Sequence, residues 1–326
     1  MIKISIITPS FNQVQFIEQT IDSVLSQNHP NLEYIIIDGG SSDGSVEIIK
    51  KYEKHLKYWV SEPDHGQSHA INKGLGHATG DIVNWLNSDD FYQPNTFQLI
   101  AQYFEDPAVN VLCARSNILE NEIVKQSTGT DIYNDNLAKT IGWARIDQPE
   151  TFFRLKAYQE VGYLNERLHF TMDREWWMRY LFKFGLLGIK KIDDVVVNFR
   201  LHDNSKTMSQ KSWFEKEHNE LFETLAHQSG LEKALPIHPN HSNSDASSLV
   251  DWKQPDVDLT KKVLAYYVLL RADQAYFHSD FTETKKLLKR LDLELLADVD
   301  KKLANKISLR TRVMPEAFHR FLKKWQ

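Results

Sequence analysis

Short apolar runs alternate with amphipathic stretches over the first ninety residues of the chain. The runs are rich in Ile and Val and span residues 4–7, 34–37, 58–60 and 82–86. Between the first two runs, apolar residues recur at helical spacing from 14 to 25, and Asn12 can cap that helix. Residues 45–55 and 68–77 supply the next two crossovers. The pattern predicts an α/β fold with a largely parallel sheet and helices on both faces.

A polar, turn-forming segment follows each of these predicted strands. The segments are residues 8–12, 38–44, 61–66 and 87–90. Because ligands of open α/β sheets bind at the carboxyl ends of the strands, the four segments predict one binding crevice at that edge. The last segment, Asn87-Ser88-Asp89-Asp90, offers the amide, hydroxyl and carboxylate oxygens that hard divalent cations prefer. A cation held there can carry a diphosphate, although a capped turn would have the same composition.

The remainder of the chain divides into a mixed region and a helical one. Helix and strand patterns continue to a last predicted strand at 195–200, and the residues after 210 are mostly helical. Residues 236–255 are rich in Ser, Asn, His and Asp, which is typical of a linker or long loop. We therefore expect one α/β domain over 1–210 and a helical extension over 211–326, with the polar linker near 236–255.

Composition excludes several classes of protein. The chain has 326 residues, 41% of them hydrophobic and 25% charged, as in ordinary globular proteins. Its net charge of −5 argues against a nucleic-acid binder. The single Cys113 permits no intrachain disulfide and no cysteine-based zinc site. There is no apolar run long enough for a membrane span, and residues 1–3 lead directly into a strand, so we expect a cytoplasmic protein.

The last 26 residues have a different charge balance. From 301 to 326 there are eight Lys or Arg residues and one acidic residue, Glu316. One helical face of this tail is apolar, with Met314, Phe318, Phe321, Leu322 and Trp325. Such a helix either packs its apolar face on the protein or makes peripheral contact with an anionic membrane at its inner face.

The order of the motifs resembles family 2 glycosyltransferases of the GT-A fold. The residues that carry the resemblance are Thr8-Pro9-Ser10-Phe11-Asn12, the turn 38–45, Asp81 with Asn87-Ser88-Asp89-Asp90, and Gln148-Pro149 leading to Met172-Asp173. It covers about residues 3–206. The resemblance implies an inverting, metal-dependent transfer of sugar from a nucleotide-diphosphate sugar to a hydroxyl acceptor. It also implies a role in cell-surface polysaccharide or lipopolysaccharide assembly, with a saccharide or lipid-linked saccharide as acceptor.

The resemblance also implies roles for the residues after the fourth strand. Mg²⁺ or Mn²⁺ would bind Asp89 first and Asp90 second, because Asn87 stands where the family commonly has Asp. Asn87 and Ser88 would then reach the ribose. His202, after the last strand, would be a third metal ligand or a diphosphate contact.

Other residues of the resemblance would bind the nucleotide. Asp38 would contact base and ribose, and since Gly39 stands where many members have a second Asp, the base stays open, with a UDP-sugar favoured. Thr8, Pro9 and Phe11 would form the opposite wall, with Phe11 packing rather than stacking. Asp64 would hold base or ribose, and Lys73 a phosphate.

Asp173 is the candidate general base, because an inverting transfer needs a carboxylate beside the acceptor hydroxyl. Met172 precedes it where the family usually has Glu, and an acidic residue in a first helical turn also suits the helix dipole. Of Trp176 and Trp177, we expect one in the core and the other beside the acceptor.

Two other functions share some of these features. A sugar-phosphate nucleotidyltransferase also uses an α/β sheet and metal-binding carboxylates, but it would carry a basic glycine-rich loop after the first strand. A non-catalytic nucleotide-sugar binder would not need Asp89 and Asp173. His65 and His69 have the spacing of a zinc helix, but the sequence shows no third ligand, so we expect no zinc there.

Overall fold

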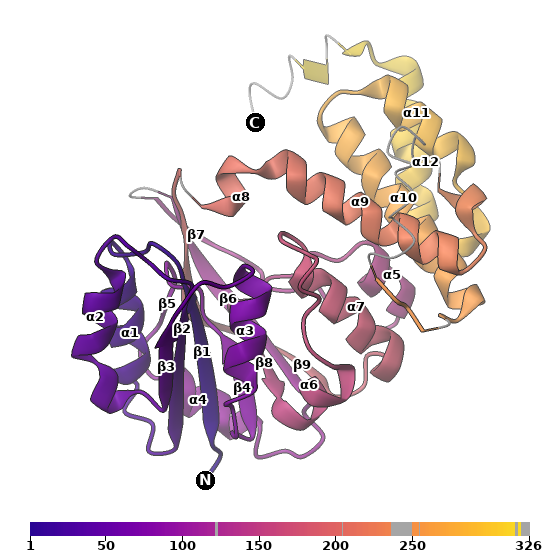
Figure 1. The fold of residues 1–326 in the computed structure, drawn as a ribbon. Coiled ribbons are helices and arrows are strands. Elements are labelled where there is room, and N and C mark those ends of the chain that lie inside the picture. Colours follow the sequence, from indigo (N-terminus) through magenta and orange to yellow (C-terminus); the bar gives the residue numbers. More distant parts are fainter. Residues whose placement is uncertain (121–122, 204, 236–249, 254, 317–318, 321–326) are drawn as a thin grey trace. The chain divides into compact units, whose positions relative to one another are not determined.

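The computed structural model describes residues 1–326 except 121–122, 204, 236–249, 254, 317–318 and 321–326. The chain forms two compact units (Figure 1). Unit 1 comprises 1–132 and 145–217, and unit 2 comprises 133–144 and 218–326. Because unit 2 includes a segment from within the predicted first domain, the division differs from the boundary predicted at residue 210.

Unit 1 is built on one mixed sheet. The described strands are β1 (Ile4–Ser10), β2 (Leu32–Asp38), β3 (Tyr58–Ser61), β4 (Ile82–Trp85), β5 (Phe91–Tyr92), β6 (Val111–Glu120), β7 (Ile123–Gln126), β8 (Thr151–Arg154) and β9 (Ile189–Leu201). Their order is β3-β2-β1-β4-β8-β6-β9-β5, with β7 paired to β6. The first four strands are parallel, as the sequence pattern predicts, whereas β8 is antiparallel to both of its neighbours.

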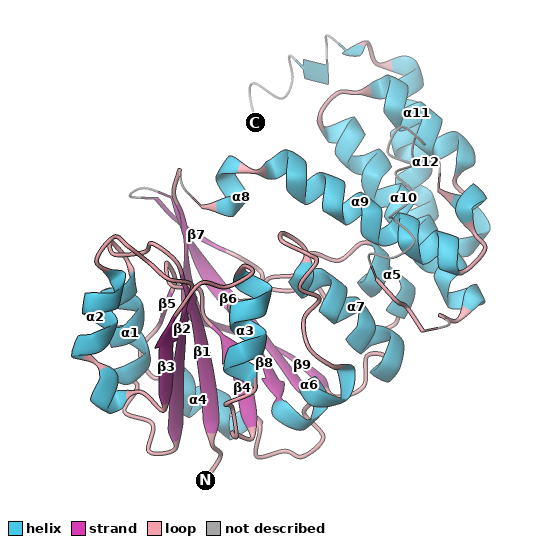
Figure 2. Ribbon diagram, in the orientation of Figure 1, coloured by secondary structure: helices cyan, strands magenta, loops and turns pink. Residues whose placement is uncertain are grey.

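Helices cover both faces of this sheet (Figure 2). The helices of unit 1 are α1 (Ile17–Leu25), α2 (Ser45–Lys51), η1 (Glu53–His55), α3 (Gln67–Leu75), α4 (Thr96–Tyr103), α6 (Leu155–Val161), α7 (Met172–Phe184), α8 (Lys206–Ser209) and the first part of α9 (Lys211–Gln228). The apolar face of α1, with Ile17, Ile21 and Val24, joins the core beneath the parallel strands. A Cβ at Gly74 would lie 2.5 Å from Ile7 Cγ2, so this glycine allows α3 to pack closely on β1.

Unit 2 is helical. It contains α5 (Leu137–Gly142), the rest of α9, η2 (Glu232–Ala234), α10 (Val257–Phe277), α11 (Phe281–Arg290), η5 (Leu293–Leu295) and α12 (Asp298–Val313). α5 packs tightly on α10, since a Cβ at Gly142 would lie 2.3 Å from the Val263 carbonyl oxygen. Lys139 Nζ also pairs with Asp300 Oδ1 at 2.6 Å. These contacts are between residues far apart in sequence, which explains why the pattern alone assigned α5 to the first domain.

Two predicted features fall largely outside the described residues. Most of the predicted linker lies in 236–249, and four of the five apolar tail positions lie in 317–318 or 321–326. In the part of the chain that the structure describes, none of the helices is both long and apolar enough to cross a bilayer.

Candidate active site

The carboxyl ends of the parallel strands bring the four polar segments of unit 1 together. The sheet register aligns Ser10, Asp38 and Ser61 at the ends of β1, β2 and β3. Side chains then connect the segments: the Asn12 amide donates to Ser41 Oγ at 2.8 Å, and Gln67 Nε2 donates to Asn87 Oδ1 at 2.8 Å. The segments therefore form one polar edge.

The turn after β4 places the adjacent carboxylates of Asp89 and Asp90 in different surroundings. Asp90 is 0% exposed, and its Oδ1 accepts a 2.9 Å hydrogen bond from the Arg200 amide. Burial, reinforced by the nearby charge of Asp89, raises the pKa of Asp90 well above its ordinary value. Thr20 Oγ1 contacts the carbonyl oxygens of Ser88 and Asp90 at 2.9 and 2.7 Å. Asp90 therefore holds the turn in place.

Asp89 is paired with a residue 113 positions away. Its Oδ2 lies 3.1 Å from His202 Nε2, and the two side chains are 19% and 20% exposed. Arg200 strengthens this junction by donating to the Asp89 carbonyl oxygen. The structure thus brings together two of the three predicted metal ligands, Asp89 and His202, and turns Asp90 toward the Arg200 backbone. A carboxylate oxygen beside an imidazole nitrogen is a donor set that fits a divalent cation such as Mn²⁺.

Three of the predicted nucleotide contacts are buried and support the edge instead of lining it. Asp38 is 0% exposed, and its carboxylate accepts from the amides of Gly40 and Ser41 and from the hydroxyls of Ser41 and Ser61. Thr8 is also 0% exposed and its hydroxyl lies 3.0 Å from Tyr34 OH. Pro9 lies in the same buried strand. Direct side-chain contacts of Asp38 and Thr8 with a nucleotide are therefore not supported by this geometry, because neither offers accessible surface.

Phe11 is more exposed than the sequence predicted. We expected its ring to pack, but it is 60% exposed and is available to a ligand. Ser88, in contrast, is only 5% exposed and contributes its carbonyl oxygen to the Thr20 contact. Asn87 is half-buried and accepts from Gln67, so its predicted ribose contact stays a prediction.

Asp64 fills space that Gly39 leaves open. A Cβ at Gly39 would lie 2.8 Å from Asp64 Oδ2, while Asp64 Oδ1 accepts from the Gly66 amide at 2.7 Å. The glycine that interrupts the family pattern thus accommodates a carboxylate from the next strand end. Lys73, predicted to bind phosphate, forms an ion pair with Glu62, so a phosphate would have to compete with that carboxylate.

Asp173 lies in the first turn of α7 and lines a small pocket. The other lining residues are Trp85, Thr130, Ile146, Gln148, Thr151, Phe153, Trp176 and Trp177. Burial among these side chains raises the pKa of Asp173 to about 6, although the Arg174 amide donates to its Oδ1. Such a pKa suits a general base near neutral pH.

The two tryptophans after Asp173 do not divide as expected. Trp176 and Trp177 are 1% and 2% exposed, so both belong to the core around the pocket. Trp176 Nε1 donates to the Gly162 carbonyl oxygen at 2.8 Å, which satisfies its polar atom. Helical spacing separates their directions, but Phe153 and Tyr180 supply aromatic partners for both rings.

The sequence reasoning missed Glu217, the carboxylate that fixes the loop before Asp173. It accepts from the backbone amides of His169, Phe170 and Thr171 at 2.6–2.8 Å and from the Thr171 hydroxyl at 2.9 Å. Glu217 is 8% exposed. A single Glu in a polar helix gives no sequence signal for such a role, because its partners lie more than 40 positions earlier.

Lys206 was also missed. Its Nζ donates to Gln67 Oε1 at 3.0 Å and to the His169 carbonyl oxygen at 3.2 Å. Because Gln67 also contacts Asn87, Lys206 places a positive charge next to the polar edge. Its position four residues after His202 is the one signal that could have drawn attention to it.

Solved structures show the same fold. The TarS 1-349 fragment of S. aureus, in a complex with UDP-GlcNAc, has a TM-score of 0.60 and 15% identity over 99% of this chain and 92% of that one. The mannosyltransferase PcManGT of Pyrobaculum calidifontis, in a complex with GDP-Man and Mn²⁺, has a TM-score of 0.54 and 16% identity, covering 97% and 82%. These similarities confirm the predicted GT-A fold class.

Relatives identified by sequence are named as glycosyltransferases. The putative teichuronic acid biosynthesis glycosyltransferase TuaG of Bacillus subtilis is 41% identical over 65% of this chain and 86% of its own length. An uncharacterized glycosyltransferase of Nostoc is 26% identical over 64% of this chain and 68% of its own length. Two from Mycobacterium tuberculosis are 42% identical over 88 residues, only 34% of their length.

A family model covers more than half of the chain and all of the candidate residues up to Asp173. The model described as glycosyl transferase family 2 matches residues 5–179. This match includes the four strand ends, the Asn87–Asp90 turn and the start of α7. The chain belongs to glycosyl transferase family 2.

Proposed function

We propose that this glycosyltransferase is an inverting, metal-dependent enzyme that moves a sugar from a nucleotide-diphosphate sugar to a hydroxyl acceptor. The observation that carries the proposal is the Asp89–His202 pair at the carboxyl edge of the parallel strands. The pocket carboxylate of Asp173 supports it. The nucleotidyltransferase alternative loses its basis, because the matched family model is a glycosyltransferase model.

The donor would lie along the polar edge. The two structural neighbours were solved with UDP-GlcNAc and with GDP-Man, and we propose a donor of the same chemical class, with a UDP-sugar favoured. The accessible groups for its nucleoside are the exposed ring of Phe11 and the carboxylate of Asp64. Lys206 Nζ, held by Gln67 and the His169 carbonyl, supplies a positive charge for the diphosphate.

Asp89 and His202 would hold Mn²⁺ or Mg²⁺, with Asp90 keeping the turn rigid. The cation would neutralise the charge that develops on the leaving diphosphate. Asp89 Oδ2 and His202 Nε2 lie 3.1 Å apart. A ligand pair that is already assembled needs little rearrangement to bind.

Asp173 would act on the acceptor. Its ionised carboxylate removes the proton of the acceptor hydroxyl while the oxygen attacks the anomeric carbon opposite the diphosphate. The bond to the diphosphate breaks with its electron pair on the departing oxygen, so the anomeric configuration inverts and no covalent enzyme intermediate forms. A raised pKa makes the carboxylate a stronger base than an exposed Asp.

For the acceptor we propose a saccharide or lipid-linked saccharide of a cell-surface polysaccharide, including lipopolysaccharide. The support is TuaG, whose name assigns it to teichuronic acid biosynthesis. The enzyme would then work in the cytoplasm at the inner face of the plasma membrane. Its basic tail is the candidate for membrane contact.

The test is a donor panel with and without Mn²⁺. The full chain is incubated with UDP-, GDP- and dTDP-sugars and simple saccharide acceptors, and the product configuration is read by NMR. We expect one nucleotide class to be consumed, activity to vanish with EDTA and return with Mn²⁺, and the anomeric centre to invert. Retention of configuration would overturn the inverting mechanism, and activity insensitive to EDTA would overturn metal dependence.

A further inference from the structure

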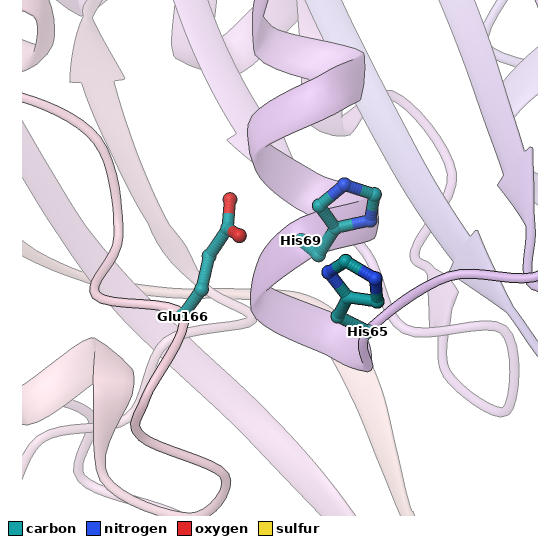
Figure 3. Close-up of side chains that lie close together, drawn as sticks. All are labelled: His65, His69 and Glu166. Carbon is teal, nitrogen blue, oxygen red and sulfur yellow. The ribbon is translucent and has the colours of Figure 1, made fainter.

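Two histidines and a glutamate converge on the surface of unit 1, at the start of α3 (Figure 3). They are His65, His69 and Glu166, and their candidate ligand atoms all lie within 4.8 Å of one another. His65 precedes α3, His69 lies in its first turn, and Glu166 comes from the loop before α7. The sequence spacing offered two ligands, and the third comes from almost 100 residues later.

The donor set has the chemistry of a transition-metal site. Two imidazoles and one carboxylate are the protein ligands of many zinc sites that keep a fourth position for water. The rings of His65 and His69 have centroids 4.9 Å apart, so both can reach one ion. His69 Nδ1 is buried from solvent and has no hydrogen-bond partner among the described residues. The Nδ1 atom of His69 therefore makes no hydrogen bond to the described residues.

Hydrogen bonds from side chains of α3 hold the loop that carries Glu166. Asn72 ties the loop to α3 on both sides of its amide group: Nδ2 donates to the Leu164 carbonyl at 2.9 Å, and Oδ1 accepts from the Leu164 amide at 2.9 Å. Ser68 Oγ donates to the Leu168 carbonyl at 3.0 Å. Such preorganisation lowers the cost of binding a ligand.

Glu166 also has the outer partner that metal-binding carboxylates usually have. Asn72 Nδ2 donates to Glu166 Oε1 at 2.9 Å, which orients the carboxylate and leaves Oε2 for an ion. We propose that His65, His69 and Glu166 bind a divalent transition metal, of which Zn²⁺ fits best, at a site that shares no residue with Asp89 and His202.

A bound ion would connect two parts of the site. It would join the start of α3, whose Gln67 contacts Asn87, to the loop that leads into Asp173. This ion would brace the loop and would not take part in sugar transfer. Its binding can therefore be measured whether or not the proposed reaction is correct.

The test is Co²⁺ binding by the full chain, read by visible absorption, followed by displacement with Zn²⁺. Excess Mg²⁺, which prefers oxygen ligands, is kept present to occupy the Asp89 region. We expect one equivalent of Co²⁺ to give the bands of a nitrogen-ligated, low-coordinate ion in the wild type and in His202→Ala. His69→Ala and Glu166→Gln should lose these bands, and Asn72→Ala should weaken binding by about 10- to 100-fold.

His77→Ala is the matched control, because His77 follows the same helix but stacks on Tyr58 at a centroid distance of 3.7 Å. It should bind Co²⁺ as the wild type does. Bands that persist in both His69→Ala and Glu166→Gln would overturn the proposal, as would bands that disappear only in His202→Ala. Glu166→Gln is a mild change at an exposed position, so its result does not depend on the stability of the other variant.

Discussion

The Asn87–Asp90 turn and the loop before Asp173 present their carboxylates in different ways. The turn carries its own chemistry: four consecutive residues follow one strand, and Asp90 within the turn helps to fix Asp89. The loop depends on Glu217, which belongs to α9 and lies outside the residues matched by the family model. A local motif therefore indicates the proposed metal ligand Asp89, whereas the support of the proposed base is visible only in the fold.

The largest effect is expected from Asp173→Asn. Losing a general base should lower the rate of transfer by about 10²- to 10⁴-fold while donor affinity stays unchanged. Single-turnover transfer and donor binding by calorimetry separate the two. The variant should be at least as stable as the wild type at pH 7, since burial disfavours the ionised carboxylate that it removes. Transfer that survives would place the base elsewhere.

The second largest effect is expected from Asp89→Ala, which should weaken donor binding and also slow the reaction. A cation at the leaving diphosphate contributes several kcal/mol, so the rate should fall by about 10²- to 10³-fold and the Mn²⁺ dependence should weaken. The measurement is donor hydrolysis over a Mn²⁺ titration. Asp81→Ala is a control, because that exposed aspartate accepts from the Lys3 amide at the opposite strand end. Equal rates for Asp89→Ala and the wild type would remove the metal assignment.

Glu217→Ala tests whether the base depends on distant support. It leaves three backbone amides without their carboxylate, which should lower the free energy of unfolding by about 2–4 kcal/mol. Transfer should fall more than donor binding, because the affected loop leads to Asp173. Urea unfolding and a comparison of kcat with donor KM read the two effects.

Lys211→Ala, at an exposed position on the same helix, is the control for Glu217 and should change neither quantity appreciably. If Glu217→Ala lowered stability but left the ratio of transfer to donor binding unchanged, Glu217 would be structural only.

The pH dependence of transfer should be smaller but diagnostic. With a pKa of about 6, Asp173 loses its ionised form as the pH falls, so the rate should drop roughly tenfold at one pH unit below that value. The stability of the fold has the opposite pH dependence. Because burial raises the pKa of Asp173, its contribution to the free energy of unfolding falls as the pH rises through about 6. A rate profile flat between pH 5 and 7 would contradict the assignment.

The smallest effect is expected for Lys73→Ala. The ion pair with Glu62 is partly exposed, so its loss should change stability by less than about 1 kcal/mol. Donor KM should change much less than in Asp89→Ala. A large rise in donor KM would mean that Lys73 leaves Glu62 to bind phosphate, as the sequence predicted.

Much of unit 1 could be predicted because its signals are local. Apolar runs of three to five residues indicated β1–β4, and polar segments after them indicated a shared edge, since parallel strands end on the same side. The same reasoning placed Thr8 and Asp38 at that edge. It could not show that both are fully buried there, because exposure depends on which side chains the neighbouring strands supply.

By itself, the sequence determined the parallel start of the sheet and the Asn87–Asp90 turn, because backbone propensity and residue chemistry act over a few positions. Its resemblance to family 2 glycosyltransferases made Asp173 the candidate base. Only the tertiary structure decided that Asp89 meets His202, that Glu217 holds the loop before Asp173, and that Glu166 joins His65 and His69. Each of these contacts joins residues that lie 46 to 113 positions apart in the chain. Such contacts depend on how whole elements pack, and no short pattern along the chain records that packing.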